Sequence, residues 1–240
     1  MSREEQQANK SLGLELEKII FIGRTYEEYM LMFNLTPEDL RGRSILDCPG
    51  GACSFSSHAR RQGAASTAAD MAYQHEIDQL ESKGQEDVKH TLKQLEQVRD
   101  KYRWDYFGSM NGLKQARTSA LRDCAADMRS FPEQYIYAEL PALPFADEQF
   151  DMTLSAHFLF TYADRLDFSF HEQTILELLR VTRQELRIFP TVDLSGKRYA
   201  HMNELKSLLE SRGLGVTEIR TTYEFQQEAH TMLIIAKPES

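Results

Sequence analysis

Residues 45–55 read ILDCPGGACSF, and this stretch decides the fold. An apolar strand end is followed by Asp47, by a Pro-Gly-Gly turn and by small residues that open a helix near Ser54. Gly50 and Gly51 allow the backbone to approach a ligand closely and to adopt positive φ, and the helix directs its free N–H groups at the same point. The stretch therefore predicts a strand–turn–helix loop that binds a nucleotide cofactor.

Two acids indicate which cofactor this is. A carboxylate beside the turn, at Asp47, repels a pyrophosphate but attracts the ammonium and sulfonium charges of S-adenosylmethionine. Residues 64–69 predict a second short strand that ends at Asp70, twenty residues after Gly50. An acid in that place accepts hydrogen bonds from ribose hydroxyls in nucleotide-binding βαβ units.

A third segment, ELPALPFADEQFDMTLSAHFLF at 139–160, carries Glu139, a Leu-Pro-Phe turn at 143–145 and an apolar strand from Phe150. With these segments the chain resembles the class I S-adenosylmethionine-dependent methyltransferases over residues 41–70 and 135–240. In that family an acid follows the first strand, another ends the second, and a D-A-x-x-LPF-x-D-x-x-FD-like segment joins the third and fourth. The acids and this segment occur here in the same order.

The resemblance implies an α/β fold, a three-layer Rossmann-like sandwich. Its seven-stranded, mostly parallel sheet has the order 3-2-1-4-5-7-6, with an antiparallel last strand and a helical cap. The predicted hairpin of residues 215–223 and 230–237 matches the end of that sheet, which separates it from ordinary dinucleotide-binding folds.

The resemblance also implies which residues bind the cofactor. Asp70 binds the ribose, Glu139 or the backbone at Leu140 reads the adenine edge, and the turn from Asp47 to Cys53 holds the methionine end. The residues expected to contact S-adenosylmethionine are Asp47, Pro49, Gly50, Gly51, Asp70, Met71, Glu139, Leu140, Ser155 and Tyr26. Pro49 and Cys53 stand at positions where the family loop has glycine.

Composition excludes several classes of function. The 28 basic and 37 acidic residues give a net charge of −9, and no basic run is long enough to follow a phosphate backbone, which disfavours nucleic acid. The first ten residues are polar, and nowhere do about 18 uncharged apolar residues run together, so neither a signal peptide nor a membrane span is expected. A cytoplasmic location follows. The three cysteines lack the second half of a zinc site and are expected to be reduced, with no metal bound.

A single domain over residues 1–240 is expected, with two helical additions. Residues 1–40 predict an N-terminal helical segment whose Tyr26 and Tyr29 either cover the cofactor or simply pack. Residues 71–134 predict a helical cap inserted between the second and third strands, because apolar residues repeat there at helical spacing. The repeating residues are Val88, Leu92, Leu95, Val98 and Tyr102.

The cap ends in an aromatic cluster, which we define as Tyr102, Trp104, Tyr106 and Phe107. Gly108 and Gly112 follow, and they mark a break at which the chain can turn over a pocket mouth. Three interpretations remain open for the cap: packing against the core, contact with substrate, and homodimer formation.

Catalytic candidates are expected just after each strand, because ligands of open parallel sheets bind beyond the carboxyl ends of the strands. His157 is the preferred general base, since an imidazole titrates near neutral pH. Tyr162 or His171 can take that role instead, with Phe158 and Phe160 as pocket walls. A hydrogen-bonded structural histidine is the alternative interpretation of His157.

The leading hypothesis is a methyltransferase that acts on a small molecule, favoured by the acidic charge and the large cap. The alternatives are methylation of a protein or peptide, and a protein that keeps the fold without turnover and binds a cofactor or partner. A nicotinamide dehydrogenase is disfavoured, because G-x-G-x-x-G is absent and Asp47 crowds the phosphate position.

Overall fold

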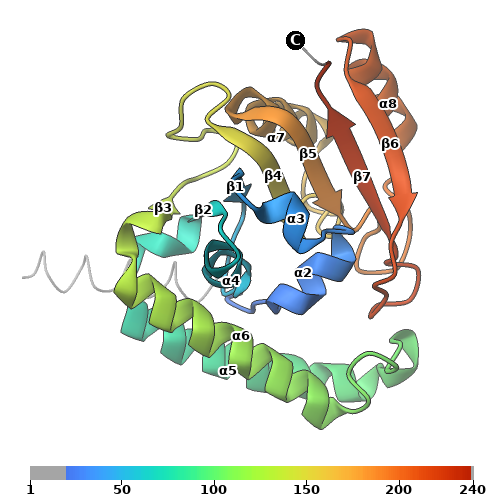
Figure 1. Ribbon diagram of the computed structural model, residues 1–240. Helices are drawn as coiled ribbons and strands as arrows, with labels where there is room; N and C mark the ends of the chain where they lie inside the picture. The colour runs from blue at the N-terminus through green and yellow to red at the C-terminus, as the bar shows by residue number, and fades with distance from the viewer. Residues whose placement is uncertain (1–19, 239–240) are drawn as a thin grey trace, which may run out of the picture.

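The computed structural model describes residues 20–238, and within them seven strands form one sheet (Figure 1). The strand order is β3-β2-β1-β4-β5-β7-β6, as predicted. The strands are β1 (Ser44–Asp47), β2 (Ala65–Asp70), β3 (Tyr135–Tyr137), β4 (Phe150–Ala156), β5 (Thr182–Phe189), β6 (Gly215–Arg220) and β7 (Thr231–Ala236). The first five run parallel, and β7 runs antiparallel to both β5 and β6, which confirms the predicted hairpin.

Helices cover both faces of this sheet, so the described residues build the predicted three layers (Figure 1). On one face the sheet packs with α7 (Phe168–Val181) and α8 (Met202–Ser211) in a common apolar core. On the other face it packs with α2 (Tyr26–Met32), α3 (Pro37–Leu40) and α4 (Phe55–Arg61). Single turns of 3-10 helix lie at Met71–Gln74, Arg99–Lys101 and Pro132–Gln134.

Between β2 and β3 the chain forms two long helices, α5 (Ile77–Gln97) and α6 (Met110–Ser130), which lie side by side next to α4 (Figure 1). Gly84 allows them to meet, since a Cβ at this position would lie 2.6 Å from a methyl group of Leu121. No helix among residues 20–238 is both long and apolar enough to cross a membrane.

One predicted boundary is wrong. The helical repeat of the cap does not continue to Tyr102, because α5 ends at Gln97 and Tyr102 instead pairs with Gln226 in an isolated β-bridge. After β4, the helix α7 begins at Phe168, where the carboxylate of Asp167 accepts the Phe170 N–H at 2.8 Å. The strand β5 begins at Thr182, directly after this helix. Of the predicted segment 1–40, residues 1–19 lie outside the described residues.

A buried ion pair joins three segments that are distant in sequence. Arg117 of α6 donates to both carboxylate oxygens of Glu28 on α2, at 2.5 and 3.0 Å, and Tyr223 donates to the same carboxylate at 2.6 Å. Glu28 is fully buried and Arg117 is 5 % exposed. Burial alone would raise the pKa of Glu28, but the charge and hydrogen bonds of Arg117 outweigh it, so the pKa is lowered. This ion pair holds the inserted helices and the chain before β7 against α2.

Arg117→Met should therefore destabilise the protein by about 3–5 kcal/mol, because it leaves the Glu28 carboxylate buried and without its cation. Urea unfolding followed by circular dichroism measures this loss. The matched control is Arg122→Met on the same helix, whose exposed side chain should contribute no more than about 0.5 kcal/mol. Equal stability of the two variants would contradict the role given to the ion pair.

Candidate functional site

The loop after β1 lies where the carboxyl ends of β1, β2 and β4 meet. The Cys48 N–H donates to Leu154 of β4 at 2.9 Å, and the Gly50 N–H donates to Ala69 of β2 at 2.9 Å. Gly51 has φ +50°, the left-handed conformation that glycine tolerates best. The predicted strand–turn–helix arrangement is confirmed, with α4 beginning directly after Ser54.

Asp70 ends β2 and fixes this turn. Its Oδ2 accepts the Gly51 N–H and its Oδ1 accepts the Ala72 N–H, both at 2.8 Å. Burial raises the pKa of Asp70, while these two backbone hydrogen bonds lower it, and the raising effect is the larger. Each carboxylate oxygen keeps a second lone pair. Asp70 thus shapes the turn and retains acceptor capacity for a ligand hydroxyl.

Tyr73 occupies the space beside the turn. Its hydroxyl donates to the Gly51 carbonyl at 2.8 Å, and a Cβ on Gly50 would lie 2.6 Å from the same oxygen. The Tyr73 hydroxyl therefore occupies the space that the absence of a side chain at Gly50 leaves open. Sequence reasoning missed Tyr73, and its signal is the tyrosine three residues after Asp70.

Asp47 is buried beneath the turn, where it accepts a hydrogen bond of 2.9 Å from the Tyr29 hydroxyl. Burial raises the pKa of Asp47 well above its ordinary value, more than the Tyr29 hydrogen bond lowers it, and the charge of Asp70 adds to the increase. Tyr29 is fully buried, so it supports Asp47 from within the core.

An exposed apolar surface lies at the ends of β2 and β3. Met71 follows Asp70 and is 46 % exposed, and Tyr137, the register partner of Asp70, is 45 % exposed. Glu139 is exposed and accepts a hydrogen bond of 3.3 Å from the Tyr137 hydroxyl, while Leu140 is partly buried. Apolar side chains and an acid therefore meet at the place predicted for the adenine.

His157 directly follows β4, in a left-handed conformation with φ +52°, and its N–H donates to the Phe189 carbonyl of β5 at 2.6 Å. Although part of the residue reaches the surface, its Nε2 is buried and has no hydrogen-bond partner. Burial, and then the charges of Arg24 and Arg117, lower its pKa well below the ordinary value, so the ring is neutral at pH 7. The Ser155 hydroxyl, two residues earlier, is also buried without a partner.

Other predicted candidates lie in different surroundings. The Tyr162 ring contacts Phe158, with ring centres 6.4 Å apart, and the guanidinium of Arg165. Both ring nitrogens of His171 are hydrogen bonded to backbone carbonyls, those of Asp167 and Leu159. His171 therefore has no free nitrogen for a substrate.

Tyr26 lies on α2, with its ring stacked on His58 and Phe55 of α4. Pro49 is partly buried and follows a cis peptide bond. It lacks an N–H, so this position of the turn offers no backbone donor.

Residues 21–25 lie directly on the glycine turn. The Arg24 N–H donates to Cys53 Sγ at 3.2 Å, and the Arg24 carbonyl accepts the Ser54 N–H at 3.0 Å. A Cβ on Gly23 would lie 1.7 Å from the Ala52 carbonyl oxygen, so only glycine fits there. Burial raises the pKa of Cys53 to about 12, which keeps the thiol protonated and unreactive.

Asp47→Asn should raise the melting temperature at pH 8. Burial raises the pKa of Asp47 in the folded protein. The carboxyl group therefore stabilises the fold most below its unfolded-state pKa of about 3.9, and this stabilisation is lost as the pH rises through the folded-state pKa. Asparagine keeps an acceptor for Tyr29 and carries no charge. Calorimetry from pH 3 to 8 should show that the melting temperature of Asp47→Asn exceeds that of the unmodified protein by an amount that grows with pH. The control Asp164→Asn, at an exposed site, should show no such increase. A lower melting temperature for Asp47→Asn at pH 8 would contradict this account.

Comparison with solved structures finds methyltransferases of low sequence identity. Magnesium protoporphyrin IX methyltransferase from Synechocystis, with bound SAM, is 12 % identical with a TM-score of 0.47, and the match covers 88 % of this chain and 76 % of that one. A TehB-like SAM-dependent methyltransferase from Corynebacterium glutamicum is 15 % identical with a TM-score of 0.46, over 98 % and 97 % of the two chains.

Among sequences, no family model matches. The uncharacterized protein MJ0045 of Methanocaldococcus jannaschii is 31 % identical over 225 residues, which cover 93 % of this chain and 99 % of that protein. The chain therefore belongs to the same protein family as MJ0045.

Proposed function

We propose that this protein transfers a methyl group from S-adenosylmethionine to a small-molecule acceptor. One observation carries the proposal: the acid that ends β2, Asp70, holds the glycine turn after β1 through the Gly51 N–H. An acid and a glycine turn at the ends of neighbouring parallel strands form the arrangement that binds the ribose and the adjoining part of an adenosyl cofactor.

The donor and acceptor groups fit this cofactor. The remaining lone pairs of Asp70 suit the ribose hydroxyls. The exposed side chain of Met71 offers the adenine an apolar face, and Glu139 and the backbone at Leu140 offer its edge polar groups. Asp47 provides negative charge near the positively charged methionine end. In this arrangement the Tyr73 hydroxyl gives up its contact with Gly51 to make room.

When bound, the cofactor supplies an electrophilic methyl group. The protein contributes position above all, since methyl transfer needs the acceptor atom in line with the sulfur at near-contact distance. Neutral His157, with an unpartnered Nε2 at the end of β4, is suited to accept a proton from an acceptor hydroxyl or amine.

A small molecule suits the acceptor side better than a macromolecule. The net charge of −9 disfavours nucleic acid. Aromatic rings from β5 and from the chain before β7 follow one another beside His157: Phe189 lies 5.5 Å from His157 between ring centres, and Tyr223 lies 5.9 Å from Phe189. Such rings favour a compact apolar acceptor.

One observation favours a second function, binding of cofactor or a partner without turnover. Tyr73 fills the approach to Gly50, and Pro49 removes a backbone donor from the turn. Binding of S-adenosylmethionine with no S-adenosylhomocysteine formed in the presence of a small-molecule extract would support this function.

Isothermal titration calorimetry with S-adenosylhomocysteine tests the proposal. The protein should bind this compound and not NAD, and Asp70→Ala should weaken binding at least tenfold, because the ribose loses its acceptor and the turn loses its anchor. Asp70→Asn retains one carbonyl acceptor, so its affinity for S-adenosylhomocysteine should lie between those of the unmodified protein and Asp70→Ala. Asp164→Ala, an exposed acid, is the control and should bind as the unmodified protein does. Absence of binding, or equal binding by Asp70→Ala, would contradict the proposal.

A further inference from the structure

Strand β6 forms a free edge of the sheet. It pairs with β7 over six residues without a register shift, and within residues 20–238 no second strand pairs with it (Figure 1). The opposite edge, β3, is only three residues long. A free edge carries unpaired N–H and C=O groups that can bind another strand. β6 is therefore the longer of the two edges at which another chain can extend the sheet.

The register with β7 shows which backbone groups of β6 are free. The Thr221 N–H donates to the His230 carbonyl at 2.7 Å, so these two residues form a hydrogen-bonded pair of the antiparallel ladder. Hydrogen-bonded pairs alternate with non-hydrogen-bonded pairs along such a ladder. The odd-numbered residues of β6 therefore bond to β7, whereas the N–H and C=O groups of Val216, Glu218 and Arg220 point away from it. Within the described part of the chain, none of these three N–H groups has an acceptor.

Most of the features that shield an edge strand are absent from β6. Proteins protect such edges with proline, with bulges, with charged side chains or with a covering loop. β6 contains neither proline nor a bulge, and α8 packs on one face of the sheet. Among residues 20–238, the Asn34 side-chain amide, 3.5 Å from the Arg220 carbonyl, is the one group that bonds to the outer side of the strand. Only the charges of Glu218 and Arg220 remain to oppose pairing.

These two charges complement each other when the strand meets its own copy. A twofold interface places the same patch on both subunits, so two copies of β6 can pair antiparallel about a twofold axis. In one register Glu218 lies opposite the partner's Arg220, and opposite charges stabilise a cross-strand pair. Shifting the register so that Glu218 faces the partner's Glu218 would bring like charges together. The charges on this edge therefore select one register of self-pairing.

Both side chains of this pair have bonding capacity left. Arg220 is exposed, and within the described residues its guanidinium forms no ion pair and no hydrogen bond. Glu218 accepts from Arg198 at 2.9 and 2.7 Å and from Lys206 at 3.5 Å. A carboxylate offers about four lone pairs, so one remains for a guanidinium of a second copy.

We propose that this protein forms a twofold dimer in which β6 pairs antiparallel with β6 of a second copy, which joins the two sheets into one. Glu218 lies opposite the partner's Arg220, and the free N–H and C=O groups of these residues bond across the axis. Ile219, which is partly buried, lies on the axis opposite the partner's Ile219. The dimer uses no residue of the cofactor site, so it does not depend on the proposed function.

Sedimentation velocity of the full-length protein over a wide range of concentration measures this association. The unmodified protein should sediment as a dimer at the higher concentrations. Arg220→Glu places an acid opposite Glu218 and should weaken dimerisation at least tenfold, whereas Arg220→Lys should retain it. Arg61→Glu makes the same change of charge at an exposed arginine that forms no ion pair with any described residue. This control should dimerise as the unmodified protein does.

A cysteine cross-link tests the register. The three native cysteines are buried, so a new thiol on the edge reacts alone. With diamide as the oxidant, Ile219→Cys should form a disulfide-linked dimer, because directly opposite residues of a non-hydrogen-bonded pair lie close together. Thr217→Cys, two residues away on the same face, should not. A monomeric unmodified protein would leave the edge to a strand of another protein and overturn the proposal. Unchanged dimerisation of Arg220→Glu, or a cross-link through position 217 instead of 219, would overturn it equally.

Discussion

The ion pair between Glu28 and Arg117 is the constraint on which the arrangement of this protein depends. Residue 28 lies before the first strand, residue 117 in the insertion and Tyr223 after the sixth strand, yet all three share one buried carboxylate. A buried charge is tolerated only when it is fully paired, so these segments are held in a single arrangement. That arrangement brings Tyr106 of the insertion next to Tyr223, whose ring in turn lies 5.9 Å from that of Phe189 at the end of β5.

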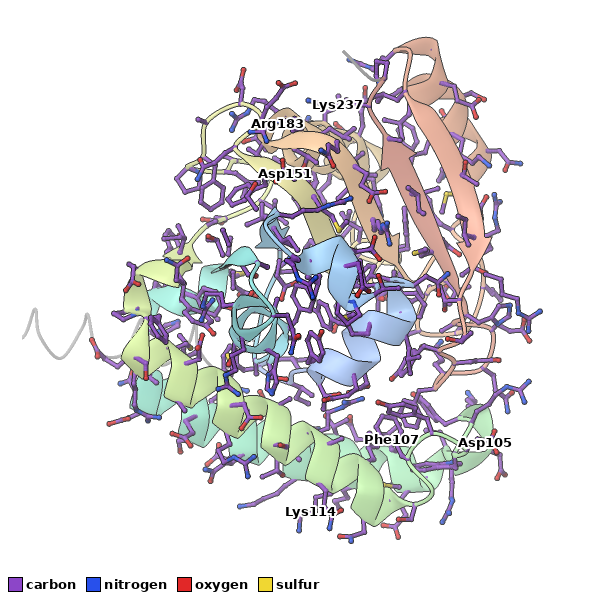
Figure 2. The ribbon with its side chains drawn as sticks, viewed as in Figure 1. Asp105, Phe107, Lys114, Asp151, Arg183 and Lys237 are labelled. Atoms are coloured by element: carbon purple, nitrogen blue, oxygen red, sulfur yellow. The ribbon has the colours of Figure 1, made fainter. Side chains whose placement is uncertain are left out.

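A second constraint acts on the opposite side of the site. The carboxylate of Asp70 accepts hydrogen bonds from the Gly51 and Ala72 N–H groups, and the Tyr73 hydroxyl donates to the Gly51 carbonyl. The acid expected to bind ribose is thus also the residue that shapes the turn, which couples the form of the loop to ligand binding. Asp151 and Arg183 form an ion pair at the other edge of the sheet, far from Phe107 (Figure 2). The polar groups there tie the beginnings of β4 and β5 together, whereas at the carboxyl end of β4 the side-chain atoms Ser155 Oγ and His157 Nε2 are buried without a hydrogen-bond partner.

Much of the fold follows from local patterns in the sequence. The strand at 150–156 and the final hairpin show apolar periodicity, and the family resemblance supplies the strand order that the structure confirms. The loop at 45–55 could be predicted because the turn needs glycine whatever surrounds it. The partners of Glu28, Arg24 and Tyr73 could not, because their roles depend on contacts across 22 to 195 residues of chain. The end of α5 was missed because Val98 and Tyr102 keep the helical spacing, although Val98 is exposed and Tyr102 pairs with Gln226 instead.

The central claim is that an adenosyl cofactor binds where β1, β2 and β4 end, next to the unpaired His157. A crystal structure of the protein with S-adenosylhomocysteine tests it most directly. The account predicts ribose hydroxyls on Asp70, adenine against Met71, a Tyr73 hydroxyl displaced from Gly51, and the sulfur directed toward His157. A compound bound elsewhere on the protein, with Tyr73 still on Gly51, would contradict it.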